Sequence, residues 1–592
     1  MKQTTACPRP VSLTLVAAIA LAALVVTLWL PFGWKVTGLY EEWIYLGDIE
    51  ARTPLQMLWK PPYVATTIRP LSVAPYLLAY LLTPDSFVAL NIIAALILFG
   101  KGLAMYFLVR RLVPANPAIA LVSAALLVVY PADDGLLSLR TTNVHASVFL
   151  LLVALNALIV AYERFGWATL LAMLVAEVVT LATYEAGLLL MFCAPVLLVW
   201  LRRGMDKRLI VVAALWEATS MYFFLLHLVE MLRDPASYPA QLMANAGLGS
   251  SSLQMLGTWL YSVTRAYIRV FATGWYHALP APDWRDPYLH LAAGLVVFVL
   301  LPAVWMHATQ SEEAEPAMDT RRYVLLASLG VVAVLPGFAL FLPTGWRNTN
   351  YRVFLFSSIG AALAVGIVCW LSARVFNEWR RGVFVGFTSL LIGIATFHAL
   401  VQHDGYFADS QRQQRILAGI ISQAPRVAPG TTVLVLDRTP TEAYTAWSMC
   451  WFVSVCLEAG LQYLYEDPGL HGTYCAPGYR PRGQASEECH FEADRVTVSY
   501  IHPGTKKEMS TSAAYDSLVV FENSVHGLSL LDDISLYSPQ AGAAGYAPRR
   551  RIDASSPISY RARAVFDRWP FEVRTPRSAW RLGTTPPQGS PR

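Results

Sequence analysis

Residues 86–109 read SFVALNIIAALILFGKGLAMYFLV, and Arg110 and Arg111 follow directly. Lys101 is the only charged residue in this stretch of 24 residues. A helix needs about 20 mostly apolar residues to cross a hydrocarbon core about 30 Å thick. Basic residues concentrate in the cytoplasmic loops of membrane proteins. The stretch therefore predicts a transmembrane helix, and similar runs along the chain decide the fold.

The whole chain, like this stretch, is rich in apolar residues and poor in charged ones. Of its 592 residues, 55% are hydrophobic and 14% are charged, whereas a soluble globular protein carries about 25% charged residues. A soluble core stops growing beyond roughly 250–300 residues, so a soluble fold could not hide this apolar mass. The composition excludes a soluble enzyme, a disordered chain and a nucleic-acid-binding module. The net charge of +5 is too small to indicate a polyanionic partner.

We predict a polytopic α-helical membrane protein with about eleven transmembrane helices. The predicted segments are approximately residues 12–33, 86–109, 117–131, 145–161, 167–183, 186–201, 209–231, 288–308, 323–342, 353–373 and 382–402. Segment 70–83 is apolar but too short to cross and is flanked by proline, so we expect an interfacial helix there.

The basic residues predict the orientation of these helices. If the N-terminus is cytoplasmic, every basic cluster falls in a cytoplasmic loop. These clusters are Arg110–Arg111, Arg164, Arg202–Arg203, Lys207–Arg208, Arg321–Arg322, Arg374 and Arg380–Arg381. An odd number of crossings then places the chain beyond about residue 403 outside. We expect a multi-pass protein of the cytoplasmic (inner) membrane with an exoplasmic C-terminal domain.

The composition changes after residue 402, where charges, glycine and proline become common. The runs TTVLVLD (431–437), RVTVSY (495–500) and DSLVVFEN (516–523) predict strands, and residues 412–423 predict a helix. We therefore divide the chain into a transmembrane domain (1–402), a soluble α/β or α+β domain (403–575) and a disordered tail (576–592).

Four of the seven cysteines lie in this soluble domain, at Cys450, Cys456, Cys475 and Cys489. An even number in an exoplasmic domain predicts two disulfides, with the pairing left open. Zinc is the alternative, because His471 and His490 are near in sequence, but the spacing matches no standard zinc finger.

Charged and polar residues gather at the predicted outer ends of the helices. They are Glu41, Glu42, Arg69, Asp133, Asp134, Arg140, His145, Glu185, Arg347 and Arg352. Taken singly they could be ordinary loop residues, but as a set they suit an amphiphilic anionic substrate. Lys101, Glu177 and Glu217 lie inside predicted helices, where a charge costs about 2.5–3.5 kcal/mol. These three could line a path, although we expect them to pair with one another.

Five short motifs follow one another in a fixed order. They are the acidic pair at 41–42, RPL at 69–71, LN…YFLVRRL between 90 and 112, YPADD at 130–134 and YEAGLLL at 184–190. This order resembles the GT-C glycosyltransferases, specifically the branch of the protein O-mannosyltransferases and lipid A aminoarabinose transferases. It is most similar to the bacterial relatives of the eukaryotic transmembrane O-mannosyltransferases. The resemblance covers about residues 10–400 and leaves out the C-terminal domain.

The resemblance implies an inverting transferase that takes a sugar from a polyprenyl-phosphate donor and passes it to a protein, lipid or glycan acceptor at the outer face. It implies Glu41 or Glu42 as the general base. Asp133, Asp134 or Glu185 would orient that base or bind a divalent cation, the only cofactor we consider. Positive charge would stabilise the leaving phosphate, and the candidates for this are Arg347, Arg352 and Arg140, with Arg69 and His145 as further substrate-binding residues.

Two other functions remain open from the residues alone. A transporter or flippase of a lipid-linked or anionic substrate would use Lys101, Glu177 and Glu217 as a relay, but such proteins often have repeated halves, and no internal repeat is visible. A non-catalytic membrane scaffold would display the C-terminal domain, but it would leave the outer set of carboxylates and arginines unexplained.

Overall fold

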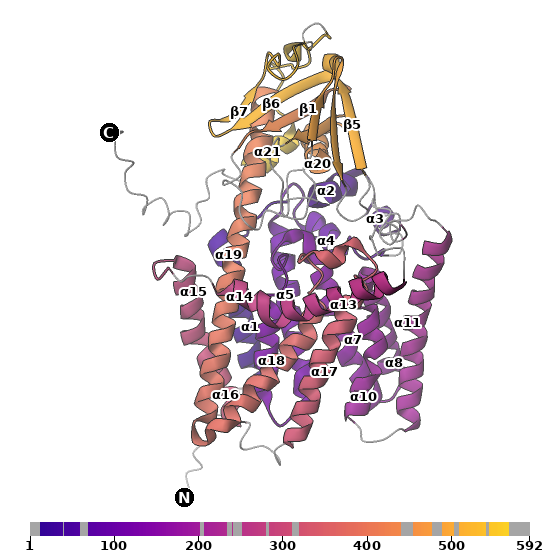
Figure 1. Ribbon diagram of the computed structural model, residues 1–592, viewed down its shortest axis with the longest axis vertical. Coiled ribbons are helices and arrows are strands. Elements are labelled where there is room, and N and C mark those ends of the chain that lie inside the picture. Colours follow the sequence, from indigo (N-terminus) through magenta and orange to yellow (C-terminus); the bar gives the residue numbers. More distant parts are fainter. Residues whose placement is uncertain are drawn as a thin grey trace, which may run out of the picture.

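The protein is a helical bundle with a strand-containing domain at one end (Figure 1). We call this end of the bundle the domain end and the opposite end the far end. The computed structural model describes residues 12–38, 41–51, 53–59, 69–201, 206–233, 240, 252–279, 283–310, 319–439, 454–475, 488–501, 508–539, 541 and 544–567.

Each predicted apolar segment coincides with helix. The bundle consists of α1 (Leu13–Trp29), α5 (Val88–Leu112), α6 (Pro117–Val129), α7 (Thr142–Glu163), α8 (Trp167–Thr183), α9 (Leu188–Cys193), α10 (Pro195–Leu201), α11 (Lys207–Arg233), α15 (Pro287–Leu295), α16 (Leu301–Gln310), α17 (Thr320–Ala339), α18 (Ser357–Ala373) and α19 (Arg380–Gln423).

Seven helical segments in the described part of the chain are long and apolar enough to cross a membrane, and three apolar helices are shorter. One of the seven, Ser357–Gln423, contains both α18 and α19. Large apolar side chains on the outside of the bundle are exposed, such as Leu232 on α11 (70%) and Phe298 beside α15 (80%). The multi-pass membrane character is therefore supported, whereas the count of eleven crossings stays a prediction.

Helix α19 joins the bundle to the C-terminal domain without a break. It has 44 residues, so it is about 66 Å long, roughly twice the thickness of a hydrocarbon core. The predicted helix at 412–423 is confirmed as the last part of α19, and the predicted domain boundary at residue 402 lies inside the same helix. Polar residues in the middle of α19 are buried and bonded to distant parts of the chain: His403 Nδ1, for example, lies 2.9 Å from the carbonyl oxygen of Leu28.

Several helices at the domain end, besides the short α3 (Pro54–Trp59), are too short to cross or do not run along the bundle. They are α2 (Glu41–Ala51), α4 (Ala74–Leu82) and α13 (Ser252–Ile268). Helix α4 lies within the predicted interfacial segment 70–83. Helix α13 lies across the bundle in Figure 1 and continues through the π-helical segment η5 (Arg269–Thr273) into α14 (Gly274–Ala278). Helix α13 was not among the predicted segments, and its Leu253, Leu256 and Leu260 are exposed on the outside of the bundle.

The C-terminal domain is an α/β structure built on two sheets. In the first, β1 (Thr432–Asp437) lies between β2 (His471–Cys475) and β6 (Leu518–Ser524), parallel to both, and β7 (Gly527–Leu530) pairs antiparallel with β6. The second is the antiparallel sheet β3 (Glu488–Phe491), β4 (Arg495–Ile501) and β5 (Glu508–Ala514). Helix α20 (Ser454–Tyr465) connects β1 to β2, and α21 (Tyr560–Asp567) follows the sheets. The three predicted strands are confirmed as β1, β4 and β6.

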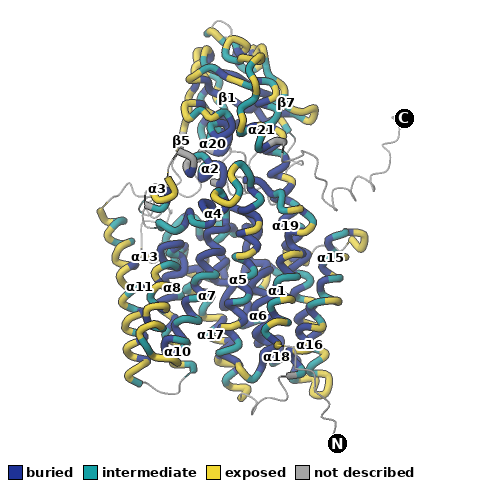
Figure 2. The backbone as a smooth tube through the Cα atoms, turned by 180° about the vertical axis from the view of Figure 1, so that it is seen from behind, coloured by how far each residue is buried: buried dark blue, intermediate teal, exposed yellow. Residues whose placement is uncertain are grey.

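The parallel sheet separates two hydrophobic cores because alternate residues of a strand point to opposite faces. Val433 and Val435 belong to the core that extends through the bundle, whereas Leu434 and Leu436 belong to a core between the two sheets. Figure 2 shows buried residues continuing from the bundle into the base of the domain. Arg412 of α19 also donates a 2.9 Å bond to Asp437 at the end of β1. The domain is thus packed onto the bundle rather than tethered to it.

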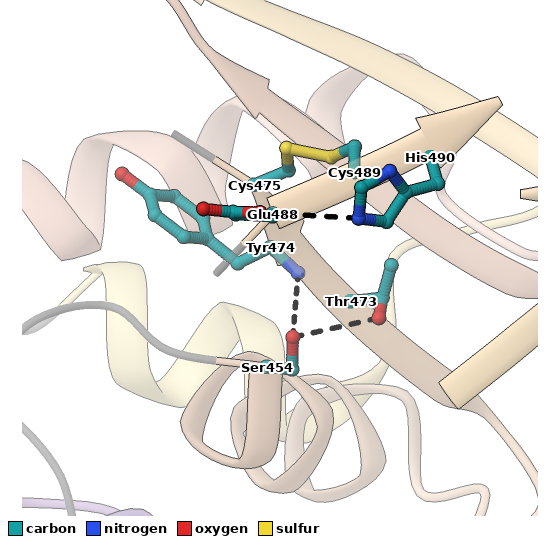
Figure 3. Close-up of a disulfide and its surroundings, with 7 residues drawn as sticks. All are labelled: Ser454, Thr473, Tyr474, Cys475, Glu488, Cys489 and His490. Atoms are coloured by element: carbon teal, nitrogen blue, oxygen red, sulfur yellow. Dashed lines mark hydrogen bonds and ion pairs between the residues drawn. A yellow bond between two sulfur atoms is a disulfide. The ribbon is translucent and has the colours of Figure 1, made fainter. Parts of the chain in front are cut away.

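A disulfide between Cys475 and Cys489 joins the last residue of β2 to β3 (Figure 3). Their Cα atoms are 5.9 Å apart, and 14 residues separate them in sequence. A bridge that closes a loop of this length contributes about 3 kcal/mol. Cys456 is buried in α20, and Cys450 lies outside the described residues, so the second predicted disulfide stays a prediction.

The predicted orientation can be tested with one added cysteine at each end. Leu536, on the C-terminal domain, is 94% exposed, and Trp379, at the far end between α18 and α19, is 77% exposed. We expect a membrane-impermeant maleimide to label Leu536→Cys but not Trp379→Cys in intact cells or right-side-out vesicles, above the labelling of the parent protein. Labelling of Trp379→Cys alone would reverse the orientation.

Candidate functional site

Most of the predicted site residues lie in one layer at the domain end of the bundle. The centre of this layer consists of three segments. They are the corner 130–138, the 3₁₀ turn η3 (Leu139–Thr141) and the connection 343–356 between α17 and α18. We call it the polar layer, and its charged members are Arg69, Asp133, Asp134, Arg140, Glu185, Arg265, Arg269, Arg347 and Arg352.

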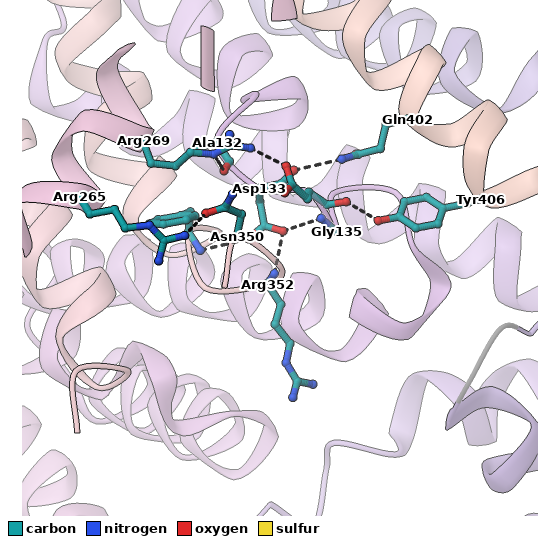
Figure 4. Close-up of polar contacts among 11 residues, drawn as sticks. Ala132, Asp133, Gly135, Arg265, Arg269, Asn350, Arg352, Gln402 and Tyr406 are labelled. Carbon is teal, nitrogen blue, oxygen red and sulfur yellow. Dashed lines mark hydrogen bonds and ion pairs between the residues drawn. The ribbon is translucent and has the colours of Figure 1, made fainter. Parts of the chain in front are cut away.

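The carboxylate of Asp133 holds two separate chain segments together (Figure 4). One oxygen accepts from the backbone N–H of Gly135 (2.7 Å) and of Arg352 (2.8 Å), and the other accepts from that of Phe354 (3.0 Å). Burial raises the pKa of Asp133 to about 7, although these three backbone donors oppose that rise. The side chain is 1% exposed. Asp133 therefore fixes the corner after α6 to the connection before α18.

The turn at Gly135 leaves no room for a side chain. A Cβ atom there would lie 2.8 Å from the ring of Tyr351. The hydroxyl of Tyr351 donates to Ser138 Oγ at 2.9 Å, and the guanidinium carbon of Arg140 lies 5.7 Å from the centre of the Tyr351 ring. Arg140 is thus placed beside the segment that Asp133 anchors.

The side chain of Asp134 pairs with Arg269, the residue that directly follows α13. Arg269 donates to Asp134 Oδ1 at 2.5 Å and to the carbonyl oxygen of Ala132 at 2.9 Å. Burial raises the pKa of Asp134, and the positive charge of Arg269 opposes this rise. The Tyr406 hydroxyl on α19 donates to the backbone carbonyl of Asp134. Asp134 therefore contributes to holding α13 and α19 against the corner.

Two arginines that the sequence analysis did not select belong to this layer. Arg265 donates to Asn350 Oδ1 at 2.8 Å and to the carbonyl oxygen of Arg347 at 3.1 Å, and Arg269 pairs with Asp134. Arg265 lies in the last turn of α13, and Arg269, four residues later, is the first residue of η5, which continues the helix. That spacing on a single helix face was the signal available in the sequence.

Arg69 was predicted to bind substrate and Glu185 to orient the base or bind a cation, and the structure pairs the two side chains with each other. The guanidinium of Arg69 donates to both carboxylate oxygens of Glu185. The guanidinium carbon of Arg69 also lies 4.5 Å from the centre of the Tyr184 ring. The backbone N–H of Leu71 donates to the carbonyl oxygen of Ala182 at 3.0 Å. This ion pair therefore fixes the RPL turn to the end of α8.

The two arginines of the 343–356 connection have different surroundings. Arg347 is 4% exposed and donates to the carbonyl oxygen of Thr344 at 2.9 Å. Arg352 is half-buried, and its guanidinium carbon lies 4.5 Å from the centre of the Trp346 ring. Its backbone is left-handed, with φ +56°. Arg352 is therefore the more accessible of the two.

His145 lies beneath this layer, inside α7. The carbonyl oxygen of Leu136 lies 2.7 Å from His145 Nε2, so that nitrogen carries the proton. The other ring nitrogen, Nδ1, lies 3.4 Å from Lys101 Nζ. The predicted pairing among Lys101, Glu177 and Glu217 was therefore wrong for Lys101, because the polar corner brings a closer partner. Glu177 instead accepts a 2.7 Å bond from Ser220 on α11.

Glu42 lies in a recess between α2, α4 and the start of α5. The side chain is 1% exposed. The recess is lined by Glu42, Tyr45, Leu46, Ile49, Tyr76, Ala79, Tyr80, Ser86, Phe87 and Leu90. The rings of Tyr45 and Tyr76 stack with centres 4.4 Å apart. Glu41 is the first residue of α2, and its side chain lies outside the described part.

Tyr76 connects this recess to the polar layer. Its hydroxyl lies 3.0 Å from the carbonyl oxygen of Arg140 and 3.2 Å from that of Leu139. The recess that contains Glu42 therefore adjoins the backbone of Arg140 in the polar layer. Across the described ranges, no group of three or more His, Cys, Asp and Glu residues is arranged to hold a metal ion.

No protein-family model matches the chain, and no curated protein sequence matches it significantly. The resemblance to the GT-C glycosyltransferases therefore rests on the motifs quoted above.

The role of Asp133 predicts a loss of stability on substitution. Asp133→Asn replaces a carboxylate oxygen with an amide nitrogen that cannot accept a backbone N–H. We expect the free energy of unfolding to fall by about 2–3 kcal/mol, because hydrogen bonds to a charged group are lost. Thermal unfolding of the purified full-length protein in detergent measures this change.

The control is Asp532→Asn, which removes an exposed ion pair with Arg549. Such surface pairs are worth about 0–1 kcal/mol. Equal destabilisation by the two variants would contradict the anchoring role of Asp133.

Proposed function

We propose that the protein is a membrane-embedded glycosyltransferase. It moves a sugar from a polyprenyl-phosphate donor to an acceptor hydroxyl at the outer face of the membrane. The observation that carries the proposal is the placement of Glu42, a buried carboxylate in a tyrosine-lined recess that adjoins a layer rich in arginine. A hydrophobic bundle around this site would let the lipid tail of the donor stay in the bilayer while its headgroup reaches the layer.

The proposed reaction needs a base on one side of the sugar and positive charge on the other. The carboxylate of Glu42 takes the proton of the acceptor hydroxyl as that oxygen bonds to the anomeric carbon. The bond between the anomeric carbon and the phosphate oxygen breaks, and the phosphate leaves with the electron pair. Arg140 and Arg352 stabilise the phosphate, because a guanidinium pairs with two phosphate oxygens at once. Attack opposite the leaving group inverts the configuration.

The choice of Glu42 as the base rests on its place in the recess beside the polar layer. Both oxygens of Asp133 accept backbone hydrogen bonds, Asp134 pairs with Arg269, and Glu185 pairs with Arg69. We therefore assign these three to shaping the site and keep Glu41 as the alternative base.

The tyrosines of the recess suit a sugar. Tyrosine offers an apolar ring face together with a hydroxyl group, and a sugar presents apolar C–H faces together with hydroxyls. Tyr45, Tyr76 and Tyr80 all line the recess that contains Glu42. They would orient the sugar or the acceptor rather than exchange protons with it.

The first test of this function is Glu42→Gln. We expect turnover to fall about 10²–10⁴-fold, the usual contribution of a general base, with little change in thermal stability. The assay is release of polyprenyl phosphate from a panel of polyprenyl-phosphate hexoses by the full-length protein in liposomes. The matched control is Glu163→Gln, which removes an ion pair with Arg111 at the far end. Unchanged turnover in Glu42→Gln would rule out this residue as the base.

The second test concerns the phosphate. We expect Arg352→Lys to weaken binding of polyprenyl phosphate about tenfold, or roughly 1.4 kcal/mol. Lysine keeps the positive charge but cannot form the bidentate hydrogen bonds that arginine makes with a phosphate. Arg374→Lys is the control, since Arg374 also lies over an aromatic ring, that of Tyr323, but at the far end. Normal binding by Arg352→Lys would leave an anchoring role for this side chain and move the phosphate site to Arg140 or Arg69.

A further inference from the structure

Helix α20 of the C-terminal domain packs directly on α2, the helix that carries Glu42 (Figure 1). The two helices meet at Trp43, which is 1% exposed. The ring centres of Trp43 and Tyr463 are 6.2 Å apart. A Cβ atom at Gly460 would lie 3.8 Å from Trp43, in ordinary contact. The residue next to Glu42 is therefore enclosed by the C-terminal domain.

Tyr463 also reaches the wall of the Glu42 recess by a hydrogen bond. Its hydroxyl donates to Asp85 Oδ1 at 2.9 Å. Asp85 has a left-handed backbone, with φ +61°. The next two residues, Ser86 and Phe87, line the recess. The bond from Tyr463 thus holds the turn from which this wall begins.

The wall and the base of the Glu42 side chain pack closely against each other and against Trp43. The ring of Phe87 meets that of Trp43 edge-on, with centres 5.1 Å apart. The indole N–H of Trp43 donates to the carbonyl oxygen of Gly38 at 3.0 Å. A Cβ atom at Gly38 would lie 2.9 Å from both the Glu42 side chain and the Phe87 ring. A shift of the turn at Asp85 would therefore be passed to Glu42.

We infer that Tyr463 is a positioning residue for Glu42, through its hydrogen bond to Asp85 and its contact with Trp43. The C-terminal domain thereby completes the recess. The guanidinium carbon of Arg561 on α21 lies 5.3 Å from the Tyr463 ring on the domain side, so two elements of the domain hold this ring. The inference rests on the proposed role of Glu42 in transfer, but the geometry of the recess can be tested without any transfer assay.

The test is Tyr463→Phe in the full-length protein, which removes only the hydroxyl. The matched control is Tyr465→Phe in the same helix, where the lost hydroxyl donates to the carbonyl oxygen of Ala424. The probe is dicyclohexylcarbodiimide, an apolar reagent for buried carboxyl groups, and mass spectrometry measures the rate at which Glu42 is modified. We expect Tyr463→Phe to raise this rate about threefold or more because the recess opens more often, while Tyr465→Phe leaves it unchanged.

Two variants of Asp85, which accepts the hydrogen bond from Tyr463, make the test specific. Asp85→Asn keeps an oxygen that can accept from Tyr463 and tolerates a left-handed backbone, so it should react like the parent protein. Asp85→Gly removes the acceptor and also tolerates that backbone. We expect the same increase in Asp85→Gly as in Tyr463→Phe and no further increase in the double variant.

Equal modification of Glu42 in Tyr463→Phe and Tyr465→Phe, including none in either, would overturn the inference. If transfer is observed, Tyr463→Phe should lower kcat about tenfold, equivalent to about 1.4 kcal/mol, with KM unchanged. A change in carbodiimide reactivity without transfer by the parent protein would reject the proposed function and leave the positioning role standing.

Discussion

The three backbone hydrogen bonds of the Asp133 carboxylate organise the domain end of the bundle. They join the corner after α6 to the connection before α18, more than 200 residues later. A carboxylate removed from water is costly unless it is hydrogen-bonded, so this contact leaves the two segments few alternative positions. Arg140 and Arg352 are placed through the same segments. A buried anchor of this kind lets short irregular loops hold charged side chains at the end of a helical bundle.

The sequence was informative wherever one physical pattern dominated. Apolar length located the bundle helices, and alternating or continuous apolar runs located β1, β4 and β6, because burial decides these elements. The continuity of α19 could not be predicted, since its polar stretch around His403 is buried by partners far away in the sequence. Arg265 and Arg269 could not be predicted as site residues for the same reason, because their contacts depend on the tertiary structure. The predicted partners of Lys101 were wrong for this reason too.

The packing of the C-terminal domain bears on the other functions considered. A domain that is only displayed would not need to share the hydrophobic core of the bundle, whereas α20 encloses Trp43 next to Glu42. A relay through the membrane would need Lys101 and Glu177 to communicate, but each is bonded locally, to His145 and to Ser220. Both observations favour a site at the domain end over a path through the bundle.

The most direct measurement is a density map of the full-length protein with a polyprenyl phosphate in lipid nanodiscs. We expect a headgroup between Arg140 and Arg352, with the lipid tail between helices and the Glu42 recess open toward the phosphate. A headgroup at the far end near Arg374, or density beside Glu177 in the middle of the bundle, would contradict it.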